Sequence, residues 1–285
     1  LSAAAACGKA SSPGRPCAAT PHLDALAASG VSFERAYAQS PICNPSRTSF
    51  LTGRRPDTTR TWDLHTQFRE IPGGDAWVTL PQYFAQRGYL TAGMGKVFHP
   101  IKRHGKTDDV AGGSWSAPYF HAKGGADTGL RLNETNCTHG ISQDDEAFTD
   151  GMLAQHAVET LRTAANGSAP FFVAVGFHRP HLPWATPQKY MDMYPLADVG
   201  LAEHNVPPAD YNATGAQPFS WDPQSGPRHC QPLYGLTYPN VTLGEYGLVD
   251  DDTARSMRRP FSSLLFSPHL PTPSGLSSGA LAAAR

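Results

Sequence analysis

The chain has 285 residues, of which 40% are hydrophobic and 16% charged, and its formal net charge is −1. This composition can supply a substantial core for one large α/β domain or two smaller ones. The near-neutral charge favours neither a nucleic-acid partner nor a membrane surface, and no apolar run reaches the roughly 18 residues that a membrane-spanning helix needs.

Cysteine and asparagine usage bears on the compartment. The five cysteines form no C-x-x-C pair, so a zinc cluster is not predicted. Five of the seven asparagines begin an N-x-S/T sequon, where chance would give about one. We interpret this excess as a sign of a secretory route with surface glycans. The candidate glycosylation sites are Asn133, Asn136, Asn166, Asn212 and Asn240.

The first predicted elements are a helix and a strand. Thr20 and Pro21 are typical of an N-cap and a first helical position, and Gly30 is a suitable stop. Residues 31–38 then alternate between apolar and polar, which predicts a half-buried strand.

A second helix is predicted to start at Pro45 and to end at Gly53. Cys43 would then lie just before a helix N-terminus. Such a position favours anionic groups, because free N–H donors and the helix dipole point toward it.

The later pattern alternates strands and helices, which predicts α/β architecture. We expect helices over 80–87 and 146–165, a strand over 89–97, and loops through most of 100–145. The apolar run at 170–177 predicts a central strand covered on both faces. The pattern weakens after residue 207.

The segment CNPSRTSFLTGR, residues 43–54, resembles the type I sulfatase signature C-x-P-S-R-x-x-x-L-T-G-R at every specified position. TPHLDALAASGVS at 20–32 is similar to a sulfatase helix. TGRRPDTTR, GKVFHP and AVGFHRPHLPW are similar to the iduronate-2-sulfatase branch. A buried structural thiol is the alternative for Cys43 alone, but a match of this length argues against it.

The resemblance implies an alkaline-phosphatase-like sulfatase fold, with a mixed, largely parallel sheet flanked by helices and incomplete at both ends. Residues 18–255 would be a partial N-terminal catalytic domain. Residues 1–17 are expected to be poorly ordered, and 256–285 to form a low-complexity tail.

The resemblance also implies a chemistry. A formylglycine-generating enzyme would oxidise Cys43 to formylglycine in the endoplasmic reticulum, and the hydrated aldehyde would attack sulfur, displace the alcohol and then expel sulfate. The substrate would be the 2-O-sulfate of iduronate in a glycosaminoglycan, and the enzyme would be lysosomal or extracellular.

Four further residues match positions of the family's site. Arg47, one helical turn from Cys43, would hold the diol and the sulfate, and Lys96 would bind a sulfate oxygen. His99 is a candidate base, and His181 a candidate sulfate contact or leaving-group acid. Taken singly, each would more often be a surface charge or a structural histidine. His178 is expected either to support the site residues from behind or to lie on the substrate side.

Family members also hold Ca²⁺, which needs about six oxygen ligands. Before Cys43 the only acids are Asp24 and Glu34, so the expected Asp-Asp pair is absent, as is the later Asp-His or Asp-Asn segment. The acidic run at 250–252 is interpreted as a solvated loop. We therefore expect the sequence to be a truncated or mis-spliced gene model of an active enzyme, with an incomplete calcium ligand set.

Two competing functions remain open. A catalytically incomplete sulfatase-like protein could bind sulfated glycans or be structural, and the missing ligands favour this reading. A phosphoryl-transfer hydrolase of the alkaline phosphatase superfamily would normally have Ser or Thr at the nucleophile position, so Cys43, Pro45 and Arg47 argue against it.

Overall fold

The computed structural model describes residues 21–33, 35–101, 108–128, 138–181, 184–201, 251–252, 254–256 and 259. These residues divide into two compact units, each assembled from separate stretches of chain. In the first unit the described residues fall within 21–32, 124–148 and 179–259, and in the second within 33–123 and 149–178.

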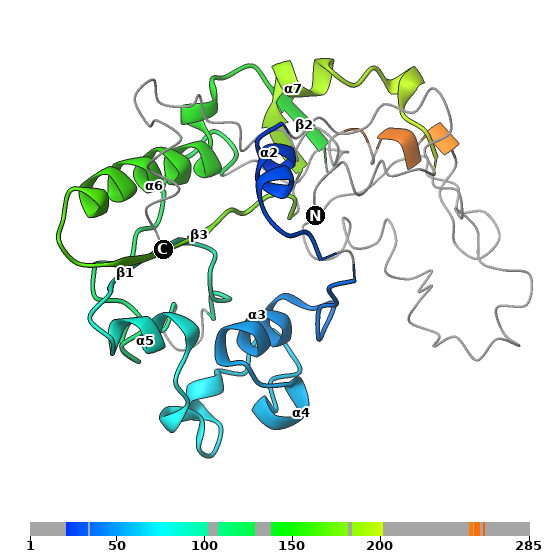
Figure 1. Ribbon diagram of the computed structural model, residues 1–285. Helices are drawn as coiled ribbons and strands as arrows, with labels where there is room; N and C mark the ends of the chain where they lie inside the picture. The colour runs from blue at the N-terminus through cyan, green and yellow to red at the C-terminus, as the bar shows by residue number, and fades with distance from the viewer. Residues whose placement is uncertain are drawn as a thin grey trace, which may run out of the picture. The chain divides into compact units, whose positions relative to one another are not determined.

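The second unit is organised around two parallel strands. Strand β1, Leu90–Gly95, pairs in register with β3, Phe171–Gly176. The connection between them includes helix α6, Thr149–Ala165, which packs against both strands (Figure 1). Parallel strands need a crossover of this kind, and the α/β architecture predicted from the sequence is confirmed.

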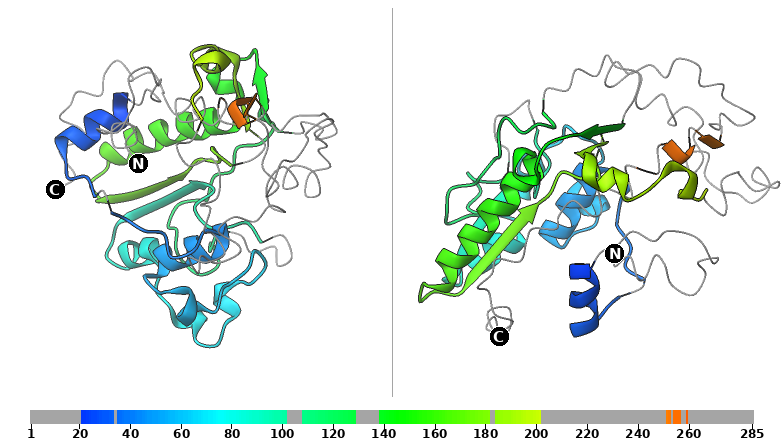
Figure 2. Two further views of the ribbon diagram at one scale, coloured as in Figure 1. Left: turned by 90° about the vertical axis from the view of Figure 1, so that its right-hand side faces the viewer. Right: turned by 90° about the horizontal axis from the view of Figure 1, so that it is seen from above.

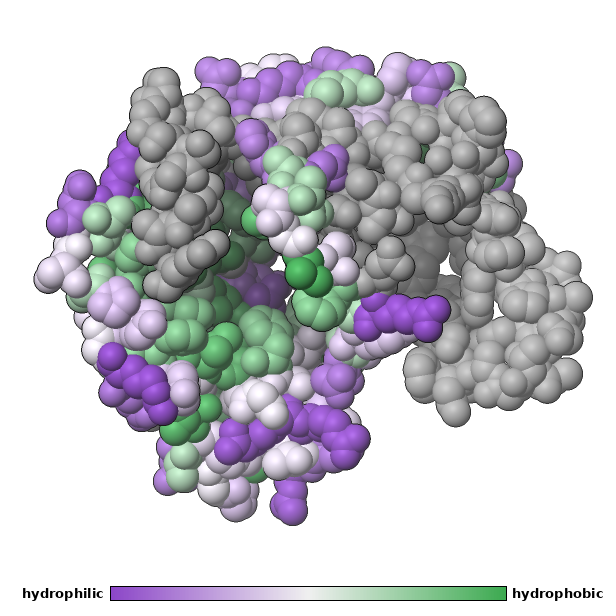
Figure 3. All heavy atoms as spheres, viewed as in Figure 1, coloured by the Kyte–Doolittle hydropathy of each residue, from purple (hydrophilic) through white to green (hydrophobic). Residues whose placement is uncertain are grey.

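The two faces of the strand pair carry different cores, because successive side chains of a strand point to opposite faces. Phe172 and Ala174 pack against an aromatic cluster, and Val173 and Val175 pack against a cluster from α6. The buried members of the aromatic cluster are Leu51, Phe68, Val97, Phe98 and Trp115, and those of the α6 cluster are Met94, Leu153 and Ala157. Figure 2 shows the strands between α6 and the layer of α3 and α5, and Figure 3 shows apolar side chains gathered in the region of the strand pair and α5.

Five short helical segments of the second unit precede β1. Helix α3 spans Cys43–Thr52, α4 spans Pro56–Thr59, and 3-10 turns cover Phe68–Glu70 and Gly74–Ala76. Helix α5, Leu80–Ala85, is fixed by a capping box between Thr79 and Gln82. Thr79 also shares a 2.6 Å hydrogen bond with Ser114, so this cap ties α5 to the loop that follows β1.

The first unit has smaller elements. Helix α2 spans Pro21–Ser29, as its N-terminal proline predicted. Strands β2, Thr138–Ile141, and β4, Trp184–Pro187, pair in parallel, and α7, Gln188–Asp192, follows β4 directly. Further 3-10 turns cover Asp145–Ala147 and Leu196–Asp198. None of the helices in the described part of the chain is long and apolar enough to cross a membrane.

One sequence prediction about a strand was wrong, and another was confirmed in part. The described residues of 31–38 are irregular, and Val31, Phe33 and Tyr37 are about four-fifths exposed, at 82%, 81% and 79%. No described strand pairs with this segment, and without a partner an alternating pattern has no ladder to join. The strand predicted at 170–177 is covered on both faces, as expected, but it is half-buried along its length and β1 is the one described strand beside it, so its predicted central place is not seen among the described residues.

Smaller differences concern the ends of elements. Strand β1 is shorter than the predicted 89–97, and α6 starts at Thr149 after a 3-10 turn, not at residue 146. The predicted loop 100–145 contains β2. The predicted disorder of 1–17 lies outside the described residues, as does the tail predicted at 256–285 except for residues 256 and 259, which are helical.

Candidate active site

Cys43 is the first residue of α3 and carries a free, half-buried thiol. The sequence predicted a helix that starts at Pro45, but the helix starts two residues earlier and Ile42 is its N-cap. Ile42 gives no side-chain hydrogen bond to the first turn. The partial positive charge of the helix N-terminus therefore acts at Cys43, where it favours an anion.

Asn44 fixes the start of α3 to a neighbouring loop. Its buried side-chain amide donates to the carbonyls of Asp63 and Thr66, each at 2.9 Å. The Asp63 carboxylate in turn accepts from the N–H groups of His65 and Thr66, and these bonds lower the pKa of Asp63. The position of Cys43 is thus set by contacts on the residue beside it.

Arg47 lies one helical turn after Cys43 and connects α3 to the segment after β1. Its Nη1 donates to the carbonyl of Lys96 and, at 3.0 Å, to that of Val97. Burial lowers the pKa of Arg47, while the nearby Cys43 and Tyr119 oppose that shift. Among the described residues no carboxylate forms an ion pair with Arg47, so this guanidinium keeps its full charge.

Lys96 follows β1 directly and is only 6% exposed. Its N–H donates to Gly176 at the end of β3, at 2.7 Å. Gly95 makes this turn possible, because its φ is +70° and a Cβ there would lie 2.3 Å from the Gly176 oxygen. Burial lowers the pKa of the Lys96 ammonium, Cys43 opposes the shift, and Arg47 adds to it.

The second unit therefore brings together three of the predicted residues. Cys43, Arg47 and Lys96 lie close enough to interact electrostatically with one another, and two of the three are cations. Two positive charges beside a helix N-terminus can hold a tetrahedral oxyanion such as sulfate.

The predicted histidines fall in two places. His99 is half-buried in the segment that continues from Lys96 through Val97 and the core residue Phe98. His181 belongs to the other unit, next to residues outside the described part. His178 ends the second unit, and its N–H donates at 2.7 Å to the buried carboxylate of Asp150 at the start of α6. The catalytic roles of His99 and His181 stay predictions.

The chain segment just before His181 is held by an ion pair that was not predicted from the sequence. The Arg179 guanidinium donates to the Asp127 carboxylate, and both side chains are almost fully buried, at 6% and 4% exposure. Arg179 also donates through Nε to the carbonyl of Ala185 in β4, at 2.9 Å. Arg179 is therefore neutralised within the first unit and has a structural role.

The described residues do not fit a calcium site at Cys43. The charged groups that interact with Cys43 are cations, whereas Ca²⁺ requires several carboxylate or carbonyl oxygens. Among the described residues no group of three or more His, Cys, Asp and Glu side chains could hold a metal ion. Asp251 and Asp252 are exposed and pair with Arg255, as expected of solvated charges, but the two residues are helical and the predicted loop was wrong.

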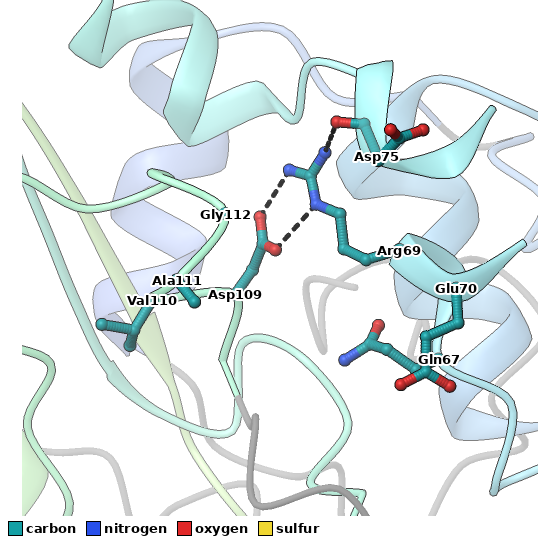
Figure 4. A pocket seen from close by; sticks show the side chains of 8 residues that line it. All are labelled: Gln67, Arg69, Glu70, Asp75, Asp109, Val110, Ala111 and Gly112. Carbon is teal, nitrogen blue, oxygen red and sulfur yellow. Dashed lines mark hydrogen bonds and ion pairs between the residues drawn. The ribbon is translucent and has the colours of Figure 1, made fainter.

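A separate cavity of about 280 Å³ lies in the second unit (Figure 4). Arg69 and Asp109 form a two-pronged ion pair in its wall, with distances of 2.8 and 2.7 Å. Arg69 also donates to Gln82 at 3.1 Å and to backbone carbonyls. These bonds commit the guanidinium, so the pair stabilises the loop after β1 and does not present a free cation to the cavity.

The fold and the motif at Cys43 define the class of the protein. The family profile for sulfatases matches residues 2–206, which is more than half of the chain, and the chain belongs to the sulfatase family. Among its relatives is human iduronate 2-sulfatase, which is 33% identical over 252 residues covering 85% of this chain and 44% of the relative. A sulfatase from Formosa agariphila is 35% identical over 63% of this chain and 38% of its own length. The chain thus spans less than half the length of these relatives.

A solved structure supports the fold. The crystal structure of phosphonate monoester hydrolase of Agrobacterium radiobacter aligns with a TM-score of 0.58 and 18% sequence identity, over 88% of this chain and 52% of the other. At that identity the likeness establishes a shared fold and carries no conclusion about the reaction.

Proposed function

We propose that the protein is a sulfuric ester hydrolase that acts through a formylglycine derived from Cys43. The observation that carries this proposal is the placement of Cys43 at the N-terminus of α3, one helical turn before Arg47, whose guanidinium binds the backbone carbonyl of Lys96. Sulfate esters are anions, and this corner combines a modifiable cysteine with positive charge from two side chains and a helix dipole.

Each residue has a separate role in the proposed site. The formylglycine supplies, as its hydrate, the hydroxyl that attacks sulfur and displaces the alcohol. Arg47 and Lys96 bind sulfate oxygens and balance the negative charge of the group in transfer. His99 takes the proton in the elimination that releases sulfate, and His181 gives a proton to the leaving alcohol.

We infer from the iduronate 2-sulfatase relatives that the substrate is a 2-O-sulfated iduronate residue, in the degradation of a glycosaminoglycan. A location in the secretory pathway, lysosomal or extracellular, agrees with this substrate and with the sequons. Asn166 directly follows α6 and is exposed, as a glycan acceptor must be, whereas Asn133, Asn136, Asn212 and Asn240 lie outside the described residues. Residues 18–255 are proposed to form part of a catalytic domain.

Calcium is implied by the family, but its carboxylate ligands would have to come from outside the described residues. A second candidate function follows from that mismatch. A protein that binds a sulfated glycan without cleaving it needs only the cations, Arg47 and Lys96, which the described residues supply.

Mass spectrometry of the Cys43 peptide tests the first proposal. The chain is co-expressed in secretory cells with formylglycine-generating enzyme, and we expect an aldehyde at residue 43 together with hydrolysis of 4-methylumbelliferyl sulfate. Cys43→Ala is the control and should lack both signals. An unmodified thiol with sulfate binding intact would instead favour the non-catalytic function.

Two disaccharides then test the substrate. A 2-O-sulfated iduronate disaccharide should be desulfated faster than one whose only sulfate is on glucosamine O6. Equal rates on the two would overturn the iduronate assignment and leave the reaction class standing.

A further inference from the structure

The Tyr119 phenol spans the two sides of Lys96. Its O–H donates to the carbonyl of Gly95 at 2.8 Å, and its oxygen accepts from the N–H of Val97 at 3.3 Å. One side chain thus binds the backbone immediately before and immediately after Lys96. Because Gly95 has a left-handed φ of +70°, this turn needs such outside contacts to keep one conformation.

Arg47 binds the same turn at two backbone carbonyls that Tyr119 does not use. It donates to the carbonyls of Lys96 and Val97, while Tyr119 takes the carbonyl of Gly95 and the N–H of Val97. Tyr119 and Arg47 also interact electrostatically. Two side chains from different parts of the chain therefore fix the backbone conformation at Lys96.

Tyr119 is itself held on several sides. Its ring contacts Trp115 and His121, with centroid distances of 5.4 and 4.9 Å. The Asp108 carboxylate interacts electrostatically with the phenol, and its Oδ2 lies 2.9 Å from Nε2 of His121. Burial first, and then Asp108, raise the pKa of Tyr119, so the phenol keeps its proton.

The loop that carries Asp108 has an unusual backbone. Asp108 and Asp109 are consecutive, buried, and left-handed, with φ of 68° and 54°. The two carboxylates diverge: Asp109 pairs with Arg69 (Figure 4), and Asp108 reaches Tyr119 and His121. Trp115 donates to the Asp108 carbonyl at 2.6 Å. Residues other than glycine keep a left-handed φ only where the surrounding structure imposes it, and such residues are common beside functional sites.

We propose that Tyr119 and Asp108 are positioning residues, which hold the turn at Gly95–Val97 so that the Lys96 ammonium is directed at the bound sulfate group. The inference rests on the proposed function, because it takes Lys96 as a sulfate ligand. Tyr119 acts through Lys96 and does not touch the sulfate. Loss of the phenol oxygen should therefore matter only while Lys96 is present.

A double-mutant cycle tests this dependence. Sulfate is titrated calorimetrically at constant ionic strength into the full 285-residue chain and into Tyr119→Phe, Lys96→Met and the double variant. Tyr119→Phe should weaken sulfate binding about tenfold in the wild-type background and less than about twofold in the Lys96→Met background. Its thermal midpoint should stay near that of wild type, because the ring contacts remain.

Two further variants complete the experiment. Tyr83→Phe removes an exposed phenol from α5 and should change nothing. Asp108→Asn keeps the shape of its side chain and should weaken sulfate binding by a few-fold, again only when Lys96 is present. It also serves as the test if Tyr119→Phe does not fold.

The outcomes separate the two proposals. Sulfate binding in the wild-type chain that does not depend on Lys96 would overturn both the sulfate site and this inference. Lys96-dependent binding that survives Tyr119→Phe and Asp108→Asn unchanged would overturn the positioning role alone. A loss of equal size in the two backgrounds would do the same, since it would mean general structural support.

Discussion

Arg179 and Arg47 have different roles because they bind different partners. Arg179, in the first unit, faces the buried Asp127 carboxylate and is neutralised by it. Arg47, in the second unit, donates to two backbone carbonyls and shares its surroundings with Lys96 and Cys43. A carbonyl orients a guanidinium without cancelling its charge.

The comparison explains why one arginine is structural and the other belongs to a candidate anion site. Both stand in motifs that resemble sulfatase segments, so the motif alone does not separate them. The partner does: an arginine paired with a buried carboxylate has its charge balanced, and one bound to carbonyls remains able to attract an anion.

The largest effect is expected for Arg179→Leu. This change leaves the Asp127 carboxylate buried without its guanidinium, and we expect a loss of about 3–5 kcal/mol in the free energy of unfolding. Urea denaturation followed by tryptophan fluorescence measures it.

The double variant Arg179→Leu with Asp127→Leu is the matched control. Because it removes both charges, it should recover much of that stability. If the double variant were no more stable than Arg179→Leu, the ion pair would not be the reason for the loss.

Arg47→Gln should have a smaller effect on folding and a larger one on the anion. Losing the bonds to the Lys96 and Val97 carbonyls should cost about 1–3 kcal/mol of stability. Sulfate affinity should fall by about 10- to 100-fold, because a charge-assisted contact to the ligand is lost as well. Calorimetry and urea denaturation measure the two quantities.

Arg55→Gln is the control for that experiment, since Arg55 is exposed and, as the N-cap of α4, gives that helix no side-chain hydrogen bond. It should leave both quantities unchanged. Unaltered sulfate affinity in Arg47→Gln would contradict the comparison between the two arginines.

The smallest effect concerns Lys96→Met and pH. Burial lowers the folded-state pKa of Lys96 below its ordinary value of 10.5, so the folded chain releases this proton at a lower pH than the unfolded chain. The charged amine therefore opposes folding at neutral pH, and this opposition fades as pH rises through the lowered pKa. Lys96→Met should be more stable than wild type at neutral pH, and the difference should shrink toward pH 10.5.

Sulfate binding by the wild-type chain should weaken over the same rise in pH, because it needs the ammonium form of Lys96. Urea denaturation and calorimetry at stepped pH measure the two trends. A stability difference that does not change with pH would show that burial of the charge is not its cause.

The predictable part of the fold was local. Pro21 and Gly53 act on the residues beside them, and the start of α2 and the end of α3 lie where these two residues indicated. The strand predicted at 31–38 failed because a strand depends on a partner elsewhere in the chain.

The candidate site divides in the same way. The segments that resemble the family identified Cys43, Arg47 and Lys96. The fold brings these three together because α3 and the end of β1 belong to one unit. Tyr119 and Asp108 gave no signal, because they lie in a stretch that was interpreted as loop and that contains no recognisable motif.

The sequence by itself determined the family, the modifiable cysteine and the helix that presents it, because these follow from one continuous segment of twelve residues. The tertiary structure decided which buried arginine is neutralised by a carboxylate and which is not. Whether a buried arginine meets a carboxylate, as Arg179 does, or a carbonyl, as Arg47 does, depends on which distant segment packs beside it. The register of β1 and β3 likewise brings Gly176 against Gly95 and so fixes the turn that carries Lys96.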